Sequence, residues 1–174
     1  MIECGILTDE DKVELLDGYV MLKIPGNPPH DSCVMVMEET VRALASAGWS
    51  VRCQSAITLP TSEPEPDLAV VRGTHRDYLL HHPGPSDCGL LIEIAGSSLT
   101  RDRDEKGPIY AAAGIDEYWI VNLLDRQIEV YSNPTPGRPH AICAVQRLFR
   151  YSETVPLILD GTIIGQIAVR DVLP

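Results

Sequence analysis

The sequence predicts a mixed α/β or α+β fold built around a central β-sheet. Residues 67–72 (DLAVVR) have an apolar centre and residues 90–95 (LLIEIA) are nearly all apolar, and both segments are short, which is typical of buried strands. The segment that begins near residue 31 instead spaces its apolar residues three or four positions apart, as an amphipathic helix does: Val34, Met37, Val41 and Leu44. Because strands and helices are mixed along 174 residues without a long linker, we expect one domain over residues 1–174.

The composition narrows the possible functions. The chain carries 14 Lys and Arg against 25 Asp and Glu, a formal net charge of −11. Such a surface repels nucleic acid and anionic membranes, which argues against a protein that coats DNA nonspecifically but not against an enzyme that recruits metal cations. No apolar segment approaches the roughly 20 residues of a membrane helix. Five cysteines without CxxC spacing, and an acidic N-terminus unlike a signal peptide, predict a cytoplasmic protein with reduced thiols.

The N-terminal segment predicts a short helix and a strand. Thr8 can cap an acidic helix that continues to about Leu16. The Asp17-Gly18 pair ends this helix, because the two residues favour a turn. Residues 19–24 (YVMLKI) then predict a strand, followed by a PGNPP loop.

The amphipathic helix follows this loop. Asp31 or Ser32 begins it, and Gly48 is its expected end. Residues 50–59 predict a second strand. The rigid PTSEPEP sequence breaks that strand before the apolar strand at residues 67–72.

The second half of the chain continues the alternation. Residues 74–82 predict a helical turn ahead of the apolar strand at 90–95. A helix near residues 105–113 ends at Gly114, and the strands YWIVN and RQIEVY come next. Residues 141–170 form a weaker β-rich tail.

Two carboxylates occupy places where a buried strand should carry none. Asp67 begins one apolar strand, and Glu93 lies inside the other. Burying an unpaired carboxylate costs several kcal/mol. Asp67 alone is better explained as a capping or turning residue at the start of its strand. Glu93 would destabilise its strand unless a cation or hydrogen-bond donors accompany it.

Lys106 is the third unusual residue. It shares one helical face with the apolar residues that should pack on the sheet: Ile109, Tyr110 and Ala113. An ion pair with Asp102, or a stem that reaches water, would explain it without any function. Two acids on neighbouring strands with a lysine directed at them suit a divalent cation, because Mg²⁺ takes hard oxygen ligands. Such an ion activates water and stabilises charge on phosphorus.

A series of short motifs extends over residues 12–131. It begins with VELLDGYV and PPH, continues with EPEPDLAVV and LLIEIAGSSLTRDRDEK, and ends with YAAAGIDEYWIVN and IEVY. This ordered series resembles the PD-(D/E)XK phosphodiesterase superfamily, and within it the small bacterial proteins called putative restriction endonucleases. The resemblance implies a restriction-endonuclease-like fold, in which helices flank a mixed central β-sheet.

The resemblance also implies roles for the unusual residues. Asp67 and Glu93 match the metal ligands for Mg²⁺ or Mn²⁺, and Lys106 matches the catalytic lysine. Glu14 matches an acid on the family's first helix that can complete the metal site. Glu14 lies in an acidic segment, so a solvated surface explains it equally well.

Three more residues have supporting places in this comparison. His30 matches the histidine that opens the long helix, although capping or packing explains it slightly better. Gln54 lies on the strand before Asp67 and would line the site. Asp102 precedes Lys106 by four residues and would position it.

Two features depart from the superfamily pattern. The pattern places a lysine two residues after the second acid, where this chain has Ala95. The resembling family supplies the lysine from the following helix, and Lys106, 106 − 93 = 13 residues after Glu93, matches that place. Because proline fits only the first turn of a helix, Gly107-Pro108 predicts a helix that begins no earlier than about residue 105 or is kinked.

We therefore expect a hydrolase, a metal-dependent DNA endonuclease in which water attacks a backbone phosphate. By analogy with the fold, a homodimer would cut both strands. A noncatalytic interaction module on the same fold is the alternative, favoured by the acidic charge and the lack of a basic stripe. Only Arg138, Arg147 and Arg150 cluster even loosely. A third interpretation is a plain α/β domain in which Glu93 pairs with an arginine.

Overall fold

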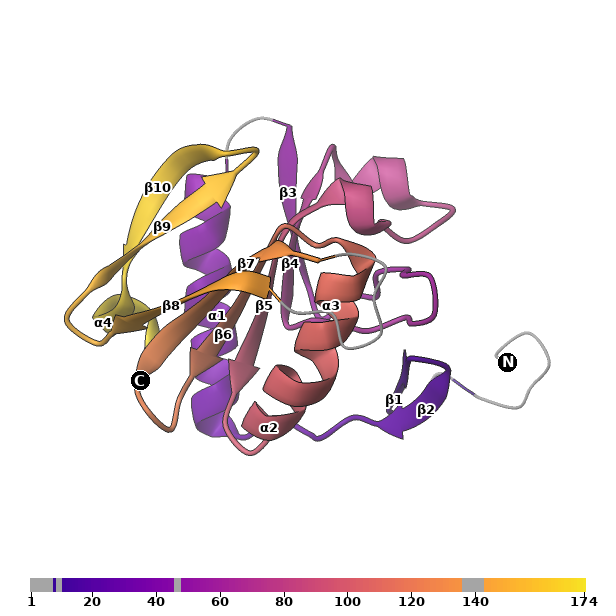
Figure 1. Ribbon diagram of the computed structural model, residues 1–174, viewed down its shortest axis with the longest axis horizontal. Coiled ribbons are helices and arrows are strands. Elements are labelled where there is room, and N and C mark those ends of the chain that lie inside the picture. The colour runs from indigo at the N-terminus through magenta and orange to yellow at the C-terminus, as the bar shows by residue number, and fades with distance from the viewer. Residues whose placement is uncertain (1–7, 9–10, 46–47, 136–142) are drawn as a thin grey trace.

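The computed structural model describes residue 8 and residues 11–45, 48–135 and 143–174. Its centre is a six-stranded sheet in the order β3-β4-β5-β6-β7-β8 (Figure 1). The strands are β3 (Trp49–Cys53), β4 (Leu68–Arg72), β5 (Cys88–Ala95), β6 (Glu117–Asn122), β7 (Gln127–Pro134) and β8 (Cys143–Arg150). Only β5 and β6 are parallel among these described strands, and the other neighbours are antiparallel. The predicted mixed sheet is confirmed.

Helices cover both faces of this sheet (Figure 1). On one face, α1 (Pro28–Leu44) contributes Met37 to an apolar core that also holds Trp119 of β6. On the other face, Tyr110 of α3 (Gly107–Ala113) packs with Tyr118 of β6. Successive residues of β6 thus enter opposite cores, as the alternation of side chains along a strand requires.

The N-terminal segment forms a β-hairpin, so the helix expected from Thr8 to about Leu16 is wrong. β1 (Val13–Leu16) pairs with β2 (Tyr19–Leu22), and its burial alternates from residue to residue. That alternation is the period of a strand, which outweighs the helix-capping pattern of the acidic residues. Asp17 and Gly18 have positive φ, as a tight hairpin turn requires. Glu14 therefore lies on a strand and not on a helix.

The long helix α1 begins three residues before Asp31. Asn27 is its N-cap, and the Asn27 side chain accepts a hydrogen bond from the His30 backbone N–H. Pro28 begins the helix at a position where its missing N–H costs nothing. The helix ends at Leu44, four residues before the expected end at Gly48. Residues 46–47 of that expected segment lie outside the described residues.

The second predicted strand is shorter than expected, because β3 ends at Cys53. The next residue, Gln54, has a φ of 44° and leaves the strand. The expected helical turn within residues 74–82 is confirmed as a 3₁₀ helix, η1 (His75–Tyr78). A second 3₁₀ helix, η2 (Pro85–Asp87), leads into β5.

The crossover between the parallel strands is helical from residue 99 onward, six residues earlier than expected. α2 (Leu99–Arg101) continues into a π-helical segment, η3 (Asp102–Lys106), and then into α3. The Gly107 N–H bonds to the Asp102 carbonyl, five residues back. The wider π turn directly precedes Pro108, and Pro108 occupies the beginning of α3. The helical segment therefore begins before residue 105, and the π turn allows this because it widens the helix just before the proline.

The β-rich tail is confirmed for the residues that the structure describes, and residues 141–142 lie outside them. β8 adds to the sheet edge, and β9 (Thr154–Leu159) pairs with β10 (Thr162–Ala168) as a separate hairpin. A short helix, α4 (Val169–Val172), follows and was not predicted. Within the described residues, no helix combines the length and apolarity needed to cross a membrane.

Candidate functional site

A small cavity of about 80 Å³ lies where the β1–β2 hairpin, the start of α1, strand β5 and the π turn meet. Its lining includes all seven residues that the sequence singles out: Glu14, His30, Gln54, Asp67, Glu93, Asp102 and Lys106. They come from segments spread over more than half of the chain. The fold therefore brings together the complete predicted set.

Asp67 is held by three hydrogen bonds at the start of β4. Its Oδ2 accepts the backbone N–H of Ile94 at 2.8 Å and lies 3.2 Å from His30 Nε2. Its Oδ1 accepts a bond from Gln54 Nε2 at 3.4 Å. Burial raises the pKa of Asp67, but these bonds outweigh it, so the pKa lies below its usual value. Asp67 is thereby kept as a carboxylate.

His30 points from the first turn of α1 toward Asp67. Its Nε2 contacts Asp67, and its Nδ1 lies 3.2 Å from Asp31 Oδ1. The hydrogen bond to Asp67 and the charges of both carboxylates raise the pKa of His30 to about 9. The imidazole is therefore a cation at neutral pH. This ion pair explains His30 better than capping, because its backbone N–H and not its side chain joins the cap.

Glu93 projects from β5 onto the face covered by α3. Oε1 accepts hydrogen bonds from Lys106 Nζ at 2.9 Å and from the Tyr110 hydroxyl at 2.8 Å. Both bonds to this side chain fall on Oε1, so among the described residues Oε2 receives none. Burial raises the pKa of Glu93 to about 8, although Lys106 opposes the rise. The partner of Glu93 is thus a lysine and not the arginine of the third interpretation.

Lys106 lies between two carboxylates. Its Nζ is 2.9 Å from Glu93 Oε1 and 3.2 Å from Glu14 Oε2. Burial lowers the pKa of Lys106, but the neighbouring acids, Glu93 first, outweigh it and raise the pKa above its usual value. Lys106 is therefore a buried cation whose ammonium lines the cavity. It neither snorkels to water nor pairs with Asp102, within the described contacts.

Glu14 reaches the site from β1. Its side chain is 3% exposed, which excludes the solvated surface that its acidic neighbours allowed. Besides Lys106, Oε2 accepts the backbone N–H of Glu65 at 3.4 Å, and Oε1 lies 4.0 Å from Arg101 Nη1. Arg101 also donates to the Leu22 carbonyl of β2 at 3.0 Å. These contacts join the hairpin to the π turn across the cavity.

Across the part of the chain that the structure describes, Asp102 forms no ion pair with Lys106, although the sequence predicts that it positions this lysine. Its Oδ2 accepts a hydrogen bond from Ser98 at 2.7 Å. Burial raises its pKa to about 6, even though Ser98 and Lys106 both oppose the rise. The negative charge of Asp102 still raises the pKa of Lys106, without an ion pair between the two side chains.

The donors around the cavity suit a hard divalent cation. The carboxylates of Asp67 and Glu93 offer oxygen ligands, and Oε2 of Glu93 has no hydrogen bond to lose. Mg²⁺ typically takes one or two carboxylates and completes its shell with water and phosphate. Within the described ranges, no three Asp, Glu, His or Cys side chains lie close enough together to form a complete protein site for a metal ion. A divalent ion held by these two carboxylates would therefore need water or a phosphate to complete its coordination shell.

Sequence reasoning missed four residues of this cavity and its surroundings. Tyr110 donates to Glu93 but was assigned to the apolar face, and only its place four residues after Lys106 signalled a polar role. Ser98 holds Asp102, while Arg101 and Lys23 line the cavity. Lys23 forms an ion pair with Glu65. Ser98 and Arg101 lie in a polar segment, and Lys23 lies at the end of an apolar one, so no pattern in the sequence singles them out.

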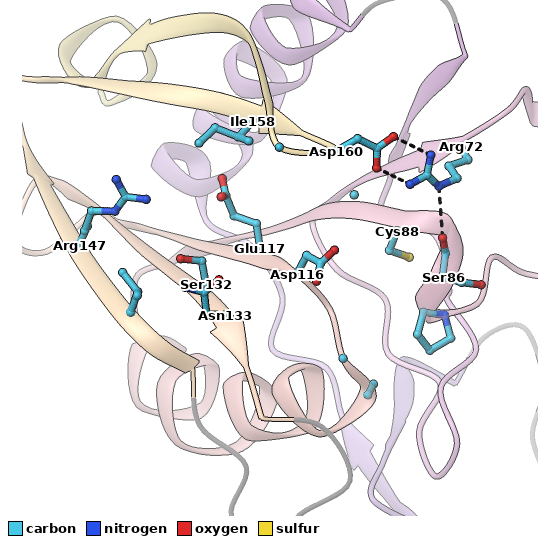
Figure 2. Close-up of a pocket in the computed structure, with 16 residues that line it drawn as sticks. Arg72, Ser86, Cys88, Asp116, Glu117, Ser132, Asn133, Arg147, Ile158 and Asp160 are labelled. Atoms are coloured by element: carbon cyan, nitrogen blue, oxygen red, sulfur yellow. Dashed lines mark hydrogen bonds and ion pairs between the residues drawn. The ribbon is translucent and has the colours of Figure 1, made fainter.

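A larger cavity of about 640 Å³ lies elsewhere, at the end of the sheet where β5 and β6 begin. Figure 2 shows its charged residues, including the paired Arg72 and Asp160, with Glu117 and Asp116 between them and Arg147. None of the seven predicted residues lines it. Its size alone does not make it the better candidate, because the buried acids and the lysine converge on the smaller cavity.

Comparison with known proteins agrees with the fold. A crystal structure described as a putative nuclease belonging to DUF820, from Anabaena variabilis ATCC 29413, superposes with a TM-score of 0.73. The match covers 98% of this chain and 94% of that chain at 12% sequence identity, so it shows a shared fold. No curated protein sequence matches the chain. The sequence profile of the Uma2 family, described as putative restriction endonuclease, matches residues 3–158. The chain therefore belongs to the Uma2 family.

Proposed function

We propose that this protein is a divalent-metal-dependent nuclease that hydrolyses phosphodiester bonds in DNA, as PD-(D/E)XK enzymes do. The observation that carries the proposal is the convergence of Asp67, Glu93 and Lys106 on one cavity. A structural role alone would not require two buried acids and a buried lysine beside an open space. The family description and the nuclease title of the structural neighbour support the same class of reaction.

Asp67 and Glu93 would hold Mg²⁺ or Mn²⁺, with Glu14 as a third carboxylate nearby. Such a cation, when bound, lowers the pKa of water and stabilises negative charge on phosphate. His30 and the Ile94 N–H keep Asp67 ionised and fixed in direction. These two partners hold the Asp67 carboxylate in place before a cation binds, so that binding need not pay for ordering the ligand.

Lys106 would act on the reacting phosphate. Its ammonium remains charged at neutral pH because the surrounding acids raise its pKa. Water attacks phosphorus opposite the leaving oxygen, the P–O bond breaks, and a phosphate monoester and a hydroxyl group form. Negative charge grows on the phosphoryl oxygens during this step, and the Lys106 ammonium offsets it.

The test is cleavage of plasmid and single-stranded DNA with Mg²⁺ or Mn²⁺. Asp67→Ala and Glu93→Gln are expected to abolish cleavage. Glu117→Gln serves as the matched control, because Glu117 is also a buried glutamate but lines the other cavity. Equal residual cleavage by wild type and Asp67→Ala would overturn the proposal, because a contaminating nuclease would then account for the signal.

A noncatalytic module on the same fold is favoured by one observation, the formal net charge of −11, which opposes the approach of DNA. Metal binding measured by calorimetry separates the two functions. A nuclease requires Mn²⁺ binding that Glu93→Gln removes and Glu117→Gln leaves intact. Failure of the wild-type protein to bind Mn²⁺ or Mg²⁺ in the presence of DNA would favour the noncatalytic module.

A further inference from the structure

Another buried carboxylate, that of Glu129, lies beside the π turn and outside the small cavity. Glu129 of β7 has a side chain with no exposed surface. Asn122 donates to its Oε1 at 2.8 Å, and the Tyr131 hydroxyl donates to its Oε2 at 2.8 Å. A buried carboxylate is costly unless a cation accompanies these neutral donors.

Arg103 supplies that cation from the π turn. Its Nε donates to Glu129 Oε2 at 2.9 Å and its Nη2 donates to Oε1, so the pair is bidentate. The two parallel bonds fix direction as well as distance, which a single point charge would not do. Nη2 also lies 3.9 Å from Asp125, in the turn that joins β6 to β7. Arg103 thus attaches the π turn to two parts of the sheet.

The backbone of the π turn has its own attachment to the sheet. The Asp102 carbonyl accepts both the Gly107 N–H and the Tyr118 hydroxyl, the latter at 3.2 Å. Tyr118 stacks on Tyr131, which itself donates to Glu129. Side chains of β6 and β7 therefore contact the π turn at its first and second residues, while Lys106 is its last.

We propose that Arg103 and Glu129 are positioning residues that set the place of Lys106 in the candidate site. Lys106 follows Arg103 by three residues within one turn, so a change in how Arg103 is anchored moves the Lys106 backbone. The helix is then held from both sides: Glu129 binds Arg103, and Glu93 binds Lys106 and Tyr110. This inference rests on the proposed function, since the place of Lys106 matters only if Lys106 meets a phosphate.

A merely structural role for the Arg103–Glu129 pair would affect folding but not the Lys106 ammonium. The chain offers a direct probe, because it contains only three lysines: Lys12, Lys23 and Lys106. Protein labelled with ¹⁵N at the lysine Nζ gives at most three ammonium signals, and Lys106→Arg identifies the one from Lys106. Its signal should be protected from solvent exchange, because Lys106 is buried between two carboxylates.

The variants are Arg103→Met and Arg103→Lys, with Arg72→Met as the matched control. Arg72 also forms a bidentate pair, with Asp160, but far from the π turn. We expect Arg103→Met to shift the Lys106 signal and speed its exchange, Arg103→Lys to do so less, and Arg72→Met to leave it unchanged. Should Arg103→Met not fold, Glu129→Gln and Arg103→Lys carry the same comparison. A Lys106 signal unchanged in folded Arg103 or Glu129 variants would overturn the inference.

Kinetics supply the second measurement. A misplacement of about 1 Å in a catalytic group costs about 100-fold in rate. We therefore expect Arg103→Met to lower kcat by about 10- to 100-fold with little change in KM for DNA, and Arg103→Lys to restore part of the loss. A wild-type protein without nuclease activity, together with a shifted Lys106 signal in Arg103→Met, would refute the proposed function and leave the positioning contact standing. A full rate in Arg103→Met would refute the positioning role.

Discussion

The ammonium nitrogen of Lys106 lies 2.9 Å from Oε1 of Glu93, and the two side chains are 7% and 5% exposed. Each residue by itself would be a costly charge inside the protein. Together they form a buried pair whose members come from a strand and from the helix that follows it. A pair of this kind contributes little net stability compared with apolar packing, so its presence beside a cavity favours a functional explanation.

Removing one partner of this pair should destabilise the protein strongly. Lys106→Met leaves Glu93 buried without its cation, and loss of one partner from a buried pair costs about 3–5 kcal/mol. Urea unfolding measures the change in the free energy of unfolding. Lys23→Met is the matched control, because the Lys23–Glu65 pair is partly exposed and contributes about 1 kcal/mol or less. Equal losses in the two variants would contradict this prediction.

Two buried glutamates outside the cavity should give opposite pH dependences. Burial raises the pKa of Glu129, but Arg103 and the other donors outweigh it, so the folded pKa lies below the ordinary 4.5. Ionised Glu129 then contributes fully to the free energy of unfolding above about pH 4.5. This contribution is lost as the pH falls through the pKa that Glu129 has in the folded protein. Urea unfolding of Glu129→Gln should show a deficit relative to wild type at neutral pH that shrinks below pH 4.5.

Glu117 should give the opposite pH dependence of stability. Burial raises its pKa above 4.5, and the bond from Trp119 does not offset this. The folded state therefore favours protonated Glu117. The contribution of this protonated group to the free energy of unfolding is complete below about pH 4.5, and it is lost as the pH rises through the pKa that Glu117 has in the folded protein. Glu117→Gln should gain stability relative to wild type as the pH rises. The same direction of pH dependence in both glutamine variants would contradict the assignment.

The sequence reveals Glu93 and Lys106 because both interrupt an apolar pattern. A carboxylate inside LLIEI and a lysine at the start of a buried helical face need partners, whatever the fold. Tyr110 could not be found in this way, because its ring fits the apolar face and only its hydroxyl is polar. The residues that can be predicted are those whose burial conflicts with their chemistry.

Two differences between the predicted and the observed elements have different physical reasons. The acidic residues near Thr8 resemble a helix start, but the pairing of β1 with β2 and the bridge from Leu15 to Glu63 decide the local structure. Tertiary pairing of this kind is absent from local propensity. At Gly107-Pro108 the rule for proline is correct, yet it does not anticipate that a π turn allows the helix to begin at Leu99.

The start of α1 gives a prediction about the N-cap. The Asn27 side chain accepts the His30 N–H at 3.1 Å, so it satisfies one of the donors left free at a helix start. Asn27→Ala should lower the free energy of unfolding by about 1 kcal/mol, whereas Asn27→Ser should retain most of it, since serine also caps. Urea unfolding of the two variants checks this. An equal loss in both would show that the side-chain bond is not the cause.

The final prediction concerns DNA binding and the net charge of −11. Without a divalent cation, the surplus of acids over the whole chain opposes an approaching phosphate. The cations that line the cavity do not reverse this, because each already faces an acid: Lys23 faces Glu65, His30 Asp67, Arg101 Glu14 and Lys106 Glu93. Fluorescence anisotropy with a labelled duplex at about 0.15 M salt should show weak binding in EDTA. Ca²⁺, which also takes oxygen ligands, should strengthen it.

Glu93→Gln should reduce this gain from Ca²⁺, and Glu117→Gln should retain it, because only Glu93 lines the cavity beside Asp67. The comparison separates a cation bound at the site from a cation that merely screens the acidic surface, since both variants replace a buried glutamate by the same neutral amide. Tight binding in EDTA at the same salt concentration would contradict the prediction. It would mean that cationic side chains of the protein bind the phosphates themselves in spite of the net negative charge.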